Sequence, residues 1–315
     1  MHMKTLAIRY GTFAASCALF LFLSLAAPNF LSAANLTNIV KNISFLAVLA
    51  LGFSIALTTA ELDLSFANVC SMACVSVGWL IHNNYPVWAA VGAGLAAGLA
   101  AGLLNGVLVT WVKIPSLIAT LATASIANGI AFMITQGVAF VGAWNPAFLW
   151  IGRGVVAGVP VLIVWLAVLM ALAWFMLKFT VTGLRMLNVG QAAEAARLAG
   201  ISVRRMKLLG LVLSGLSAGI AAVLMTSNLA SAAPNSASDF MLMSIAAVLL
   251  GMTMFEPGRP NVPGTLVGAL TIGMLGNGLV LLGAQYYMQD IALGVIIVAS
   301  VAVSSSFLKR AALTL

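Results

Sequence analysis

Apolar stretches long enough to cross a lipid bilayer as helices limit the fold of this chain more than any other feature. A membrane-spanning helix needs about 20 predominantly apolar residues, within a range of roughly 17–25. About ten such stretches lie near residues 9–27, 39–60, 64–81, 86–112, 114–135, 161–178, 207–229, 240–255, 263–283 and 290–308. The sequence therefore predicts an all-α membrane protein with about ten transmembrane helices.

The composition excludes a water-soluble fold. Of the 315 residues, 63% are hydrophobic and only 6% are charged, which is too little charge to cover a soluble surface. The net charge of +8 could suggest nucleic acid, but basic residues in the loops of a membrane protein produce the same excess. We therefore expect contact with the lipid bilayer and no nucleic-acid partner.

The basic residues predict the orientation in the membrane. If the N-terminus is cytoplasmic and ten helices follow, all 14 Lys and Arg residues except Lys41 and Arg153 lie on the cytoplasmic side. This asymmetry is what the positive-inside rule requires. We expect residues 1–315 to form a single transmembrane domain with both termini cytoplasmic and its largest cytoplasmic loop at 179–206.

Two segments have alternative interpretations. The first 27 residues also fit a signal peptide, although their apolar run exceeds the usual core of about 7–15 residues, which favours a retained helix. The eighth stretch, 240–255, is short, and Gly251 and Pro257 predict irregular backbone beside it. A broken or re-entrant helix is expected there, and the helix count stays between about nine and eleven.

A weak internal repeat links the fourth and ninth stretches. Residues 103–109 read Leu-Leu-Asn-Gly-Val-Leu-Val, and residues 275–281 read Leu-Gly-Asn-Gly-Leu-Val-Leu. Helices five apart run in opposite directions, so the repeat predicts two inverted five-helix halves, an arrangement typical of transporters. The repeated asparagines, Asn105 and Asn277, are candidates to face a central path, although chance could also produce the match.

Small and polar residues mark the third to fifth stretches. A glycine stripe at steps of four predicts a close contact with another helix; it comprises Gly94, Gly98, Gly102 and Gly106. Thr120 and Asn128 of the fifth stretch either line a polar path or bond within the helices. Asp63, beside Glu61 and Ser65 at a membrane boundary, is either functional or a cap of the next helix.

The cytoplasmic loop contains a predicted helix over Gln191–Ala199. It is Ala-rich, Gly190 precedes it, Gly200 is suited to end it, and Glu194 and Arg197 lie one turn apart. The loop could serve only to fix orientation by its charge, but that role does not need an ordered helix.

Short motifs along the chain resemble a known family. They are Asp63-Leu64-Ser65, Leu104-Asn105-Gly106, Ile114-Pro115-Ser116, Ala119-Thr120-Leu121 and the run from Glu194 to Ile201. In this order, and over nearly the whole chain, they resemble the permease subunits of ribose-type ATP-binding-cassette (ABC) sugar importers, a group that includes xylose, galactose, rhamnose and autoinducer-2 permeases. Two departures, Ala192-Ala193 for the usual Asn-Pro and the loss of glycines over 251–260, leave the substrate open.

The resemblance implies a transport subunit of the bacterial inner membrane rather than an enzyme. Its expected partners are a cytoplasmic ATP-binding subunit, a second permease, a periplasmic solute-binding protein and a small sugar. The chain has no cofactor of its own by this interpretation, because ATP and Mg²⁺ bind the partner ATPase, and no lysine here follows a glycine as a phosphate-binding loop requires. The residues that the resemblance assigns to ATPase coupling are Glu194, Ala195, Ala196, Arg197 and Gly200.

Two other classes are weighed against this one. An ion-coupled secondary transporter is favoured by the inverted repeat, but such carriers place ionisable groups at mid-membrane, whereas Asp239, Glu256 and Asp290 lie near predicted helix ends. A membrane enzyme lacks support, because no His, Cys or carboxylate constellation suits catalysis or a metal. The candidate path residues are Asp63, Ser65, Asn105, Thr120, Asn128 and Asn277.

Overall fold

The computed structural model describes the backbone of residues 2–312 and the side chains of residues 11–285 and 287–302. The chain forms two compact units: a terminal unit, Met1–Ala50 with Leu242–Leu315, and a central unit, Leu51–Met241. Helix α2 (Ala33–Thr58) passes from the first unit into the second. The side chains of Lys4, Arg9, Lys309 and Arg310, which entered the predicted orientation, lie outside the described side chains.

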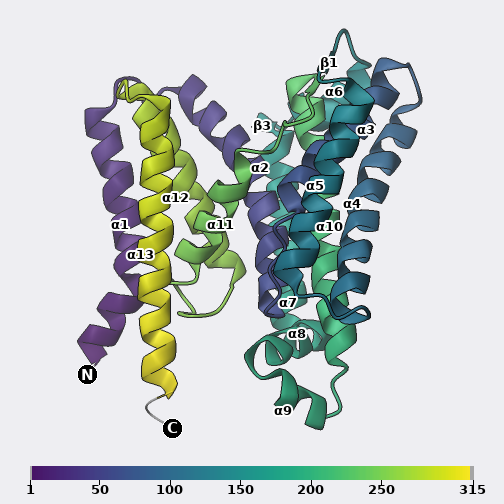
Figure 1. Cartoon of the computed structure of the whole chain (residues 1–315). Helices are drawn as coiled ribbons and strands as arrows, with labels where there is room; N and C mark the ends of the chain where they lie inside the picture. The colour runs from purple at the N-terminus through teal and green to yellow at the C-terminus, as the bar shows by residue number, and fades with distance from the viewer. Residues whose placement is uncertain (1, 313–315) are drawn as a thin grey trace. The chain divides into compact units, whose positions relative to one another are not determined.

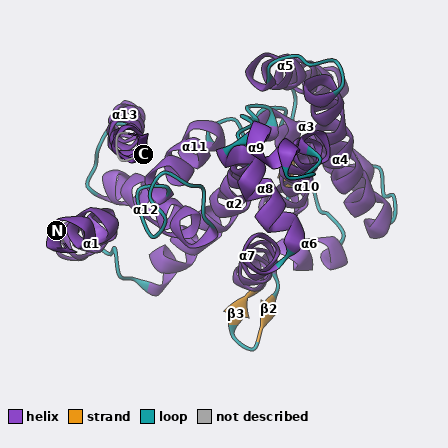
Figure 2. Cartoon of the chain, turned by 90° about the horizontal axis from the view of Figure 1, so that it is seen from below, coloured by secondary structure: helices purple, strands orange, loops and turns teal. Residues whose placement is uncertain are grey.

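The central unit is helical with two short antiparallel strand pairings. Its helices are α3 (Phe66–His82), α4 (Val87–Thr110), α5 (Ser116–Thr135), α6 (Pro146–Arg153), α7 (Val161–Phe179), α8 (Val181–Gln191), α9 (Ala193–Leu198) and α10 (Val203–Leu229). Strand β1 (Phe140–Val141) pairs antiparallel with β4 (Ser231–Ala232), so that Phe140 lies opposite Ala232. Strands β2 (Val155–Val156) and β3 (Val159–Pro160) form a hairpin before α7, drawn in orange in Figure 2.

Helices α4 and α10 lie side by side in the central unit (Figure 1) because glycines remove the side chains between them. A Cβ added at Gly98 would lie 2.2 Å from the carbonyl oxygen of Gly215, and one at Gly102 would lie 2.7 Å from that of Leu211. Gly215 reciprocates, since its Cβ would lie 2.3 Å from the carbonyl oxygen of Gly98. The predicted stripe therefore packs backbone against backbone on α10, as small residues do between membrane helices.

An apolar cluster closes one end of the central unit. It joins the end of α3 and the start of α4 to α6, α10 and β4, and its buried members are Val77, Ile81, Ala90, Trp144, Phe148, Val223 and Ala232.

The terminal unit contains α1 (His2–Ala26), the first part of α2, most of α11 (Phe240–Gly251), α12 (Val262–Leu281) and α13 (Tyr286–Ala312). Hydroxyl pairs hold α1 in place: the Oγ atoms of Thr12 and Thr253 are 2.8 Å apart, as are those of Ser16 and Thr271. Such interhelical hydrogen bonds stabilise contacts that the hydrophobic effect cannot drive within lipid.

The helices agree with an all-α membrane protein. Among the described residues, 6 helices are long and apolar enough to cross a membrane, and they are accompanied by shorter apolar helices at Gly11–Ala26, Phe66–His82, Phe240–Gly251 and Tyr287–Ala302. The expected stretches and these helices occupy the same parts of the sequence, because long apolar runs specify helices in lipid.

Helix α11 is short, as the sequence predicts. Its 12 residues rise only about 18 Å, less than the roughly 30 Å hydrocarbon core of a bilayer. It ends at Gly251, whose added Cβ would lie 2.5 Å from the carbonyl oxygen of Gly264. Irregular backbone follows until Asn261 accepts the N–H of Gly264 and caps α12.

Candidate functional site

The segment 179–206, predicted as a cytoplasmic loop, contains two helices, α8 and α9. The single helix expected over Gln191–Ala199 is shorter in the structure: Gln191 ends α8, and α9 covers only Ala193–Leu198. Ala192 separates the two helices because its backbone, with φ −154° and ψ 81°, is not helical. The prediction of one helix over Gln191–Ala199 was therefore wrong: two helices lie here, separated at Ala192.

Gly200 ends α9 as predicted. Its φ of +79° lies in the left-handed region that glycine adopts without cost. The N–H groups of Gly200 and Ile201 donate to the carbonyls of Arg197 and Ala196 at 3.0 and 2.9 Å, respectively, which satisfies the last carbonyls of the helix. The turn fixes the direction in which the chain leaves α9.

The surface of α9 combines charge with exposed apolar groups. Glu194 and Arg197 form an ion pair whose side chains are 70% and 68% exposed, so the pair adds little stability. Ala195 is also exposed, whereas Ala196 is buried. Leu198 is 81% exposed, although it lies outside the predicted membrane spans.

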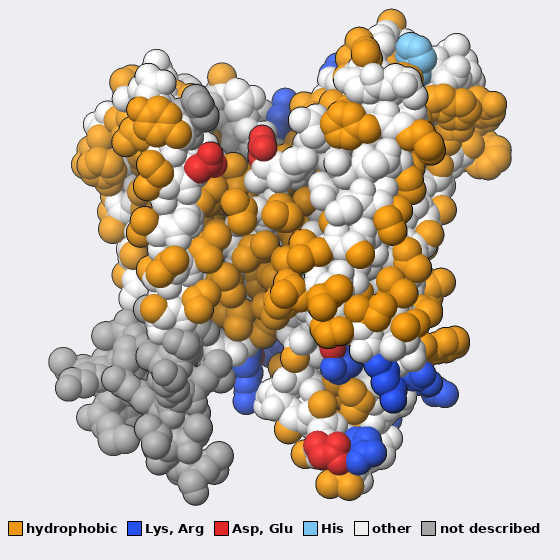
Figure 3. All heavy atoms as spheres, viewed as in Figure 1, with side chains coloured by type: hydrophobic (Ala, Val, Ile, Leu, Met, Phe, Trp, Pro, Cys, Tyr) orange, Lys and Arg blue, Asp and Glu red, His pale blue; other side chains and the backbone are white. Residues whose placement is uncertain are grey.

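A hollow of about 240 Å³ lies beside this surface, lined by Asn188, Gln191, Ala192, Ala195, Ala196, Ala199 and Ile201. Lys and Arg side chains gather at the same end of the central unit (Figure 3). A single exposed leucine is common on protein surfaces, so it is the hollow beside an exposed helix that leaves room for a partner. The loop therefore has the form of a docking element.

The loop of residues 179–206, called the docking loop from here on, packs directly on the end of α2 and on the connection between α2 and α3. A Cβ at Gly190 of α8 would lie 2.1 Å from the carbonyl oxygen of Thr58, so the glycine permits contact rather than beginning a helix. Lys207, near the start of α10, forms an ion pair with Glu61. Sequence reasoning missed this pair, because Lys207 was counted only as a charge that fixes orientation; an acidic residue at a membrane boundary does, however, predict a cationic partner.

Asp63 and Ser65 form a buried network with Asn105. Oδ1 of Asp63 accepts the backbone N–H of Ser65 at 2.9 Å and its hydroxyl at 2.6 Å. The side-chain amide of Asn105 donates to the Ser65 hydroxyl at 2.8 Å. Asp63 thus binds the residue that precedes α3 instead of the first N–H groups of the helix, and it links this turn to α4.

Two acceptor atoms of this network have no hydrogen-bond partner in the part of the chain that the structure describes. Oδ2 of Asp63 and Oδ1 of Asn105 are buried and have no hydrogen-bond partner among the described residues. Burial raises the pKa of the Asp63 carboxyl, because it destabilises the charged form, although the hydrogen bonds from Ser65 partly offset this effect. Asp63 is 0% exposed, so it does not reach an open surface of this chain.

Helix α5 binds the same connection through its first two turns. Oγ of Ser116 accepts the N–H of Leu62 at 3.2 Å, and Oγ1 of Thr120 accepts that of Leu64 at 3.1 Å. Asn128 is half-buried farther along α5. Of the candidate path residues, the structure therefore brings together Asp63, Ser65, Asn105 and Thr120, whereas Asn128 does not join them.

Asn277 lies in the terminal unit and pairs with another asparagine. Its Oδ1 accepts from Nδ2 of Asn35 at 3.1 Å, and its Nδ2 donates to Oδ1 of Asn35 at 2.8 Å. This reciprocal pair ties α12 to α2. Lining of a path by Asn105 and Asn277 stays a prediction.

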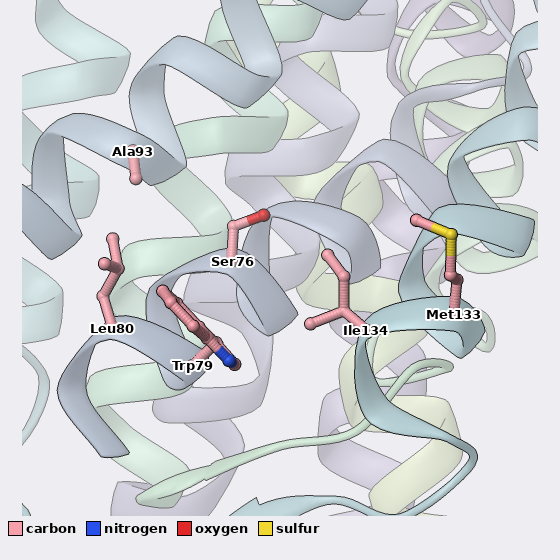
Figure 4. Close-up of a pocket in the computed structure, with 6 residues that line it drawn as sticks. All are labelled: Ser76, Trp79, Leu80, Ala93, Met133 and Ile134. Carbon is pink, nitrogen blue, oxygen red and sulfur yellow. The ribbon is translucent and has the colours of Figure 1, made fainter. Parts of the chain in front are cut away.

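A groove of about 530 Å³ lies among α3, α4 and α5 (Figure 4), lined by Ser76, Trp79, Leu80, Ala93, Met133 and Ile134. Its lining is mostly apolar, and it contains none of the candidate path residues.

Comparison with known proteins identifies the class. Residues 35–301 match the family described as branched-chain amino acid transport system / permease component. The chain belongs to this permease family. It is 34% identical over 302 residues to the ribose import permease protein RbsC of Bacillus subtilis, which covers 96% of this chain and 94% of that protein. It is also 34% identical over 294 residues to the L-arabinose transport system permease protein AraH of Escherichia coli, with 93% and 89% covered.

Family membership confirms the resemblance to ribose-type permeases that the motifs indicated. The chain is a multi-pass membrane permease subunit of an ABC importer, and ATP hydrolysis belongs to a separate subunit. The secondary-transporter alternative is therefore set aside. Importers of this class work with an ATPase and a solute-binding protein.

Proposed function

We propose that this permease imports a small sugar or a related polyhydroxylated solute across the bacterial cytoplasmic membrane. The curated relatives named above are described as ribose and L-arabinose transporters, and the chain aligns with them over nearly its full length. A second permease, identical or related, completes the path, and ATP with Mg²⁺ binds the partner ATPase.

The proposed topology has ten spans, two inverted five-helix repeats and both termini in the cytoplasm. The long apolar helices together with the shorter ones support this number. The concentration of basic side chains at the end of the central unit that carries α9 supports a cytoplasmic position for that end.

The proposed coupling element is α9, which docks into a groove of the ATPase. The exposed surface of α9 beside the hollow of about 240 Å³ carries this proposal. Glu194, Ala195 and Arg197 form its exposed face, Ala196 anchors it on the permease, and Gly200 fixes its end. A short capped helix transmits force because it does not deform when the ATPase subunits close.

The test of this coupling role combines crosslinking and transport. We expect Ala195→Cys to crosslink to a cysteine in the ATPase groove, whereas Val155→Cys, in the β2–β3 hairpin, does not. Arg197→Glu should lower the uptake of radiolabelled ribose or arabinose per ATP hydrolysed by about tenfold, which corresponds to about 1.4 kcal/mol of lost coupling. Lys113→Glu makes the same charge change outside α8 and α9 and should leave the ratio unchanged.

Normal import by both Arg197→Glu and Gly200→Trp, with no crosslink from Ala195→Cys, would show that α9 does not couple the permease to the ATPase. Screening ribose and arabinose against the cognate solute-binding protein tests the sugar class separately. Binding of an amino acid instead would contradict the sugar assignment and leave the coupling role intact.

A further inference from the structure

The connection between α2 and α3, residues 59–65, has no regular secondary structure, yet it buries alternate side chains, while Ala60 and Leu62 are exposed. Connecting segments normally run over the protein surface, because their backbone polar groups are costly to bury. Here Thr59, Glu61, Asp63 and Ser65 are each 5% exposed or less. Such burial requires specific partners for these four side chains.

One set of partners belongs to the docking loop and to the start of α10, which follows it. Glu61 forms its ion pair with Lys207, just after the loop ends. A Cβ at Gly190 of α8 would lie 3.3 Å from the backbone nitrogen of Ala60, and a Cβ at Gly210 of α10 would lie 2.9 Å from Oγ1 of Thr59. Segments on both sides of α9 therefore contact the connection, and glycines allow two of these contacts to be close.

The other set belongs to α5 and α4. Ser116 and Thr120 accept the backbone N–H groups of Leu62 and Leu64, and Asn105 of α4 binds Ser65. These bonds tie the first two turns of α5 to the backbone of the connection, so a shift of residues 62–64 must carry the start of α5 with it.

Two groups of helices in the central unit both contact this connection. Helix α5 packs mainly on α3 and α4, whereas α8 and α9 pack on each other, on α7 and on α10. Residues 59–65 contact members of both groups.

We infer that residues 59–65 form a joint that transmits displacement of the docking loop to α5. In this joint the Glu61–Lys207 ion pair holds the connection against the start of α10. This inference rests on the proposed docking of α9. A partly buried ion pair is costly to desolvate and stabilises little compared with an apolar contact, so its use here is to hold the start of α10, where the docking loop ends, in one register with the connection. Glu61 and Lys207 are positioning residues and do not touch the solute.

The test follows α5 directly and needs no knowledge of the sugar. A reporter cysteine, Ile118→Cys, lies on the first turn of α5 at a position that is 59% exposed. Cys17 is exposed and is replaced by serine, whereas Cys70 and Cys74 are buried. The permease is reconstituted with its ATPase in proteoliposomes, and the rate of maleimide labelling is measured without nucleotide and with ATP and vanadate.

We expect ATP and vanadate to change the labelling rate of the reporter, and Glu61→Gln to reduce this change by about fivefold or more, the lower end of typical coupling between sites. The Ala195→Cys crosslink and ATP hydrolysis should persist in Glu61→Gln. Exchange of the charges, Glu61→Lys with Lys207→Glu, should restore the response. Asp239→Asn, which removes an exposed carboxylate of the same unit, is the matched control.

Two results would overturn the joint: a full nucleotide response in Glu61→Gln, or failure of the charge exchange to restore a lost response. If Glu61→Gln does not accumulate in the membrane, Ser116→Ala tests the other side of the joint, and a full response there overturns it equally. Absence of the Ala195→Cys crosslink in the otherwise unaltered permease would instead contradict the docking of α9, so the two failures are distinguishable.

Discussion

Asn105 and Asn277 occupy similar sequence contexts, yet each has its own kind of partner. Asn105 is fully buried and donates to a serine hydroxyl, whereas Asn277 exchanges two hydrogen bonds with Asn35, 242 positions earlier in the chain. The Asn-Gly repeat could indicate polar groups within apolar helices. It could not identify their partners, because these depend on which helices pack together.

At the Asn105 site, the prediction concerns stability. Asn105→Ala removes the donor to Ser65 and should lower the free energy of unfolding by about 1 kcal/mol, since hydrogen bonds between membrane helices average about 0.6 and reach about 1.7 kcal/mol. The combined Asn105→Ala and Ser65→Ala variant should lose less than the sum of the single variants. Thermal melting in detergent measures this coupling, with Asn128→Ala as the control. Strict additivity would contradict a direct Asn105–Ser65 interaction.

The Glu61–Lys207 ion pair could not be predicted from the two residues alone. Glu61 was a candidate because of its position at a membrane boundary, and Lys207 because of its charge, but 146 positions separate them. Only the close approach of α2, α8 and α10, made possible by Gly190 and Gly210, brings the two side chains together.

Whole helices were more predictable than their contacts. Long apolar runs located the apolar helices, because lipid leaves helix as the main way to satisfy the backbone. The start of α9 was misplaced, since an Ala-rich sequence does not reveal the non-helical backbone of Ala192. The glycine stripe of α4 indicated close packing, but nothing in the stripe itself pointed to α10 as the neighbour.

The stripe predicts different outcomes for glycines of the same helix. Gly98→Ala places a Cβ 2.2 Å from the backbone of α10, and this overpacking should cost about 1–3 kcal/mol. Gly92→Ala is the matched control, because a Cβ there meets nothing within 4 Å; the better helix propensity of alanine should stabilise by up to about 1 kcal/mol. Equal melting temperatures for the two variants would show that the α4–α10 contact tolerates a side chain.

At the scale of the molecule, the predicted charge asymmetry can be followed along α10. This helix has 27 residues and a length of about 40 Å, enough to cross the hydrocarbon core. At its start, Lys207 binds Glu61, and Nε of Arg204 donates to the carbonyl of Thr110 at the end of α4. At its other end, Arg153 donates to the carbonyl of Asn228. Lys207 and Arg204 therefore lie at one end of α10 and Arg153 contacts the other end. The predicted orientation assigns these two ends to opposite sides of the membrane.

This arrangement predicts which cysteines react from outside an intact cell. In a Cys17→Ser background, Val155→Cys, next to Arg153 and 60% exposed before substitution, should be labelled by a membrane-impermeant maleimide. In cells that lack the partner ATPase, which would otherwise cover α9, Ala195→Cys should react only after the membrane is permeabilised, because the basic end of the central unit is retained in the cytoplasm. Labelling after permeabilisation controls for reactivity, since both positions are exposed in the folded chain. Labelling of Ala195→Cys in intact cells, with Val155→Cys protected, would reverse the orientation and place α9 out of reach of any cytoplasmic ATPase.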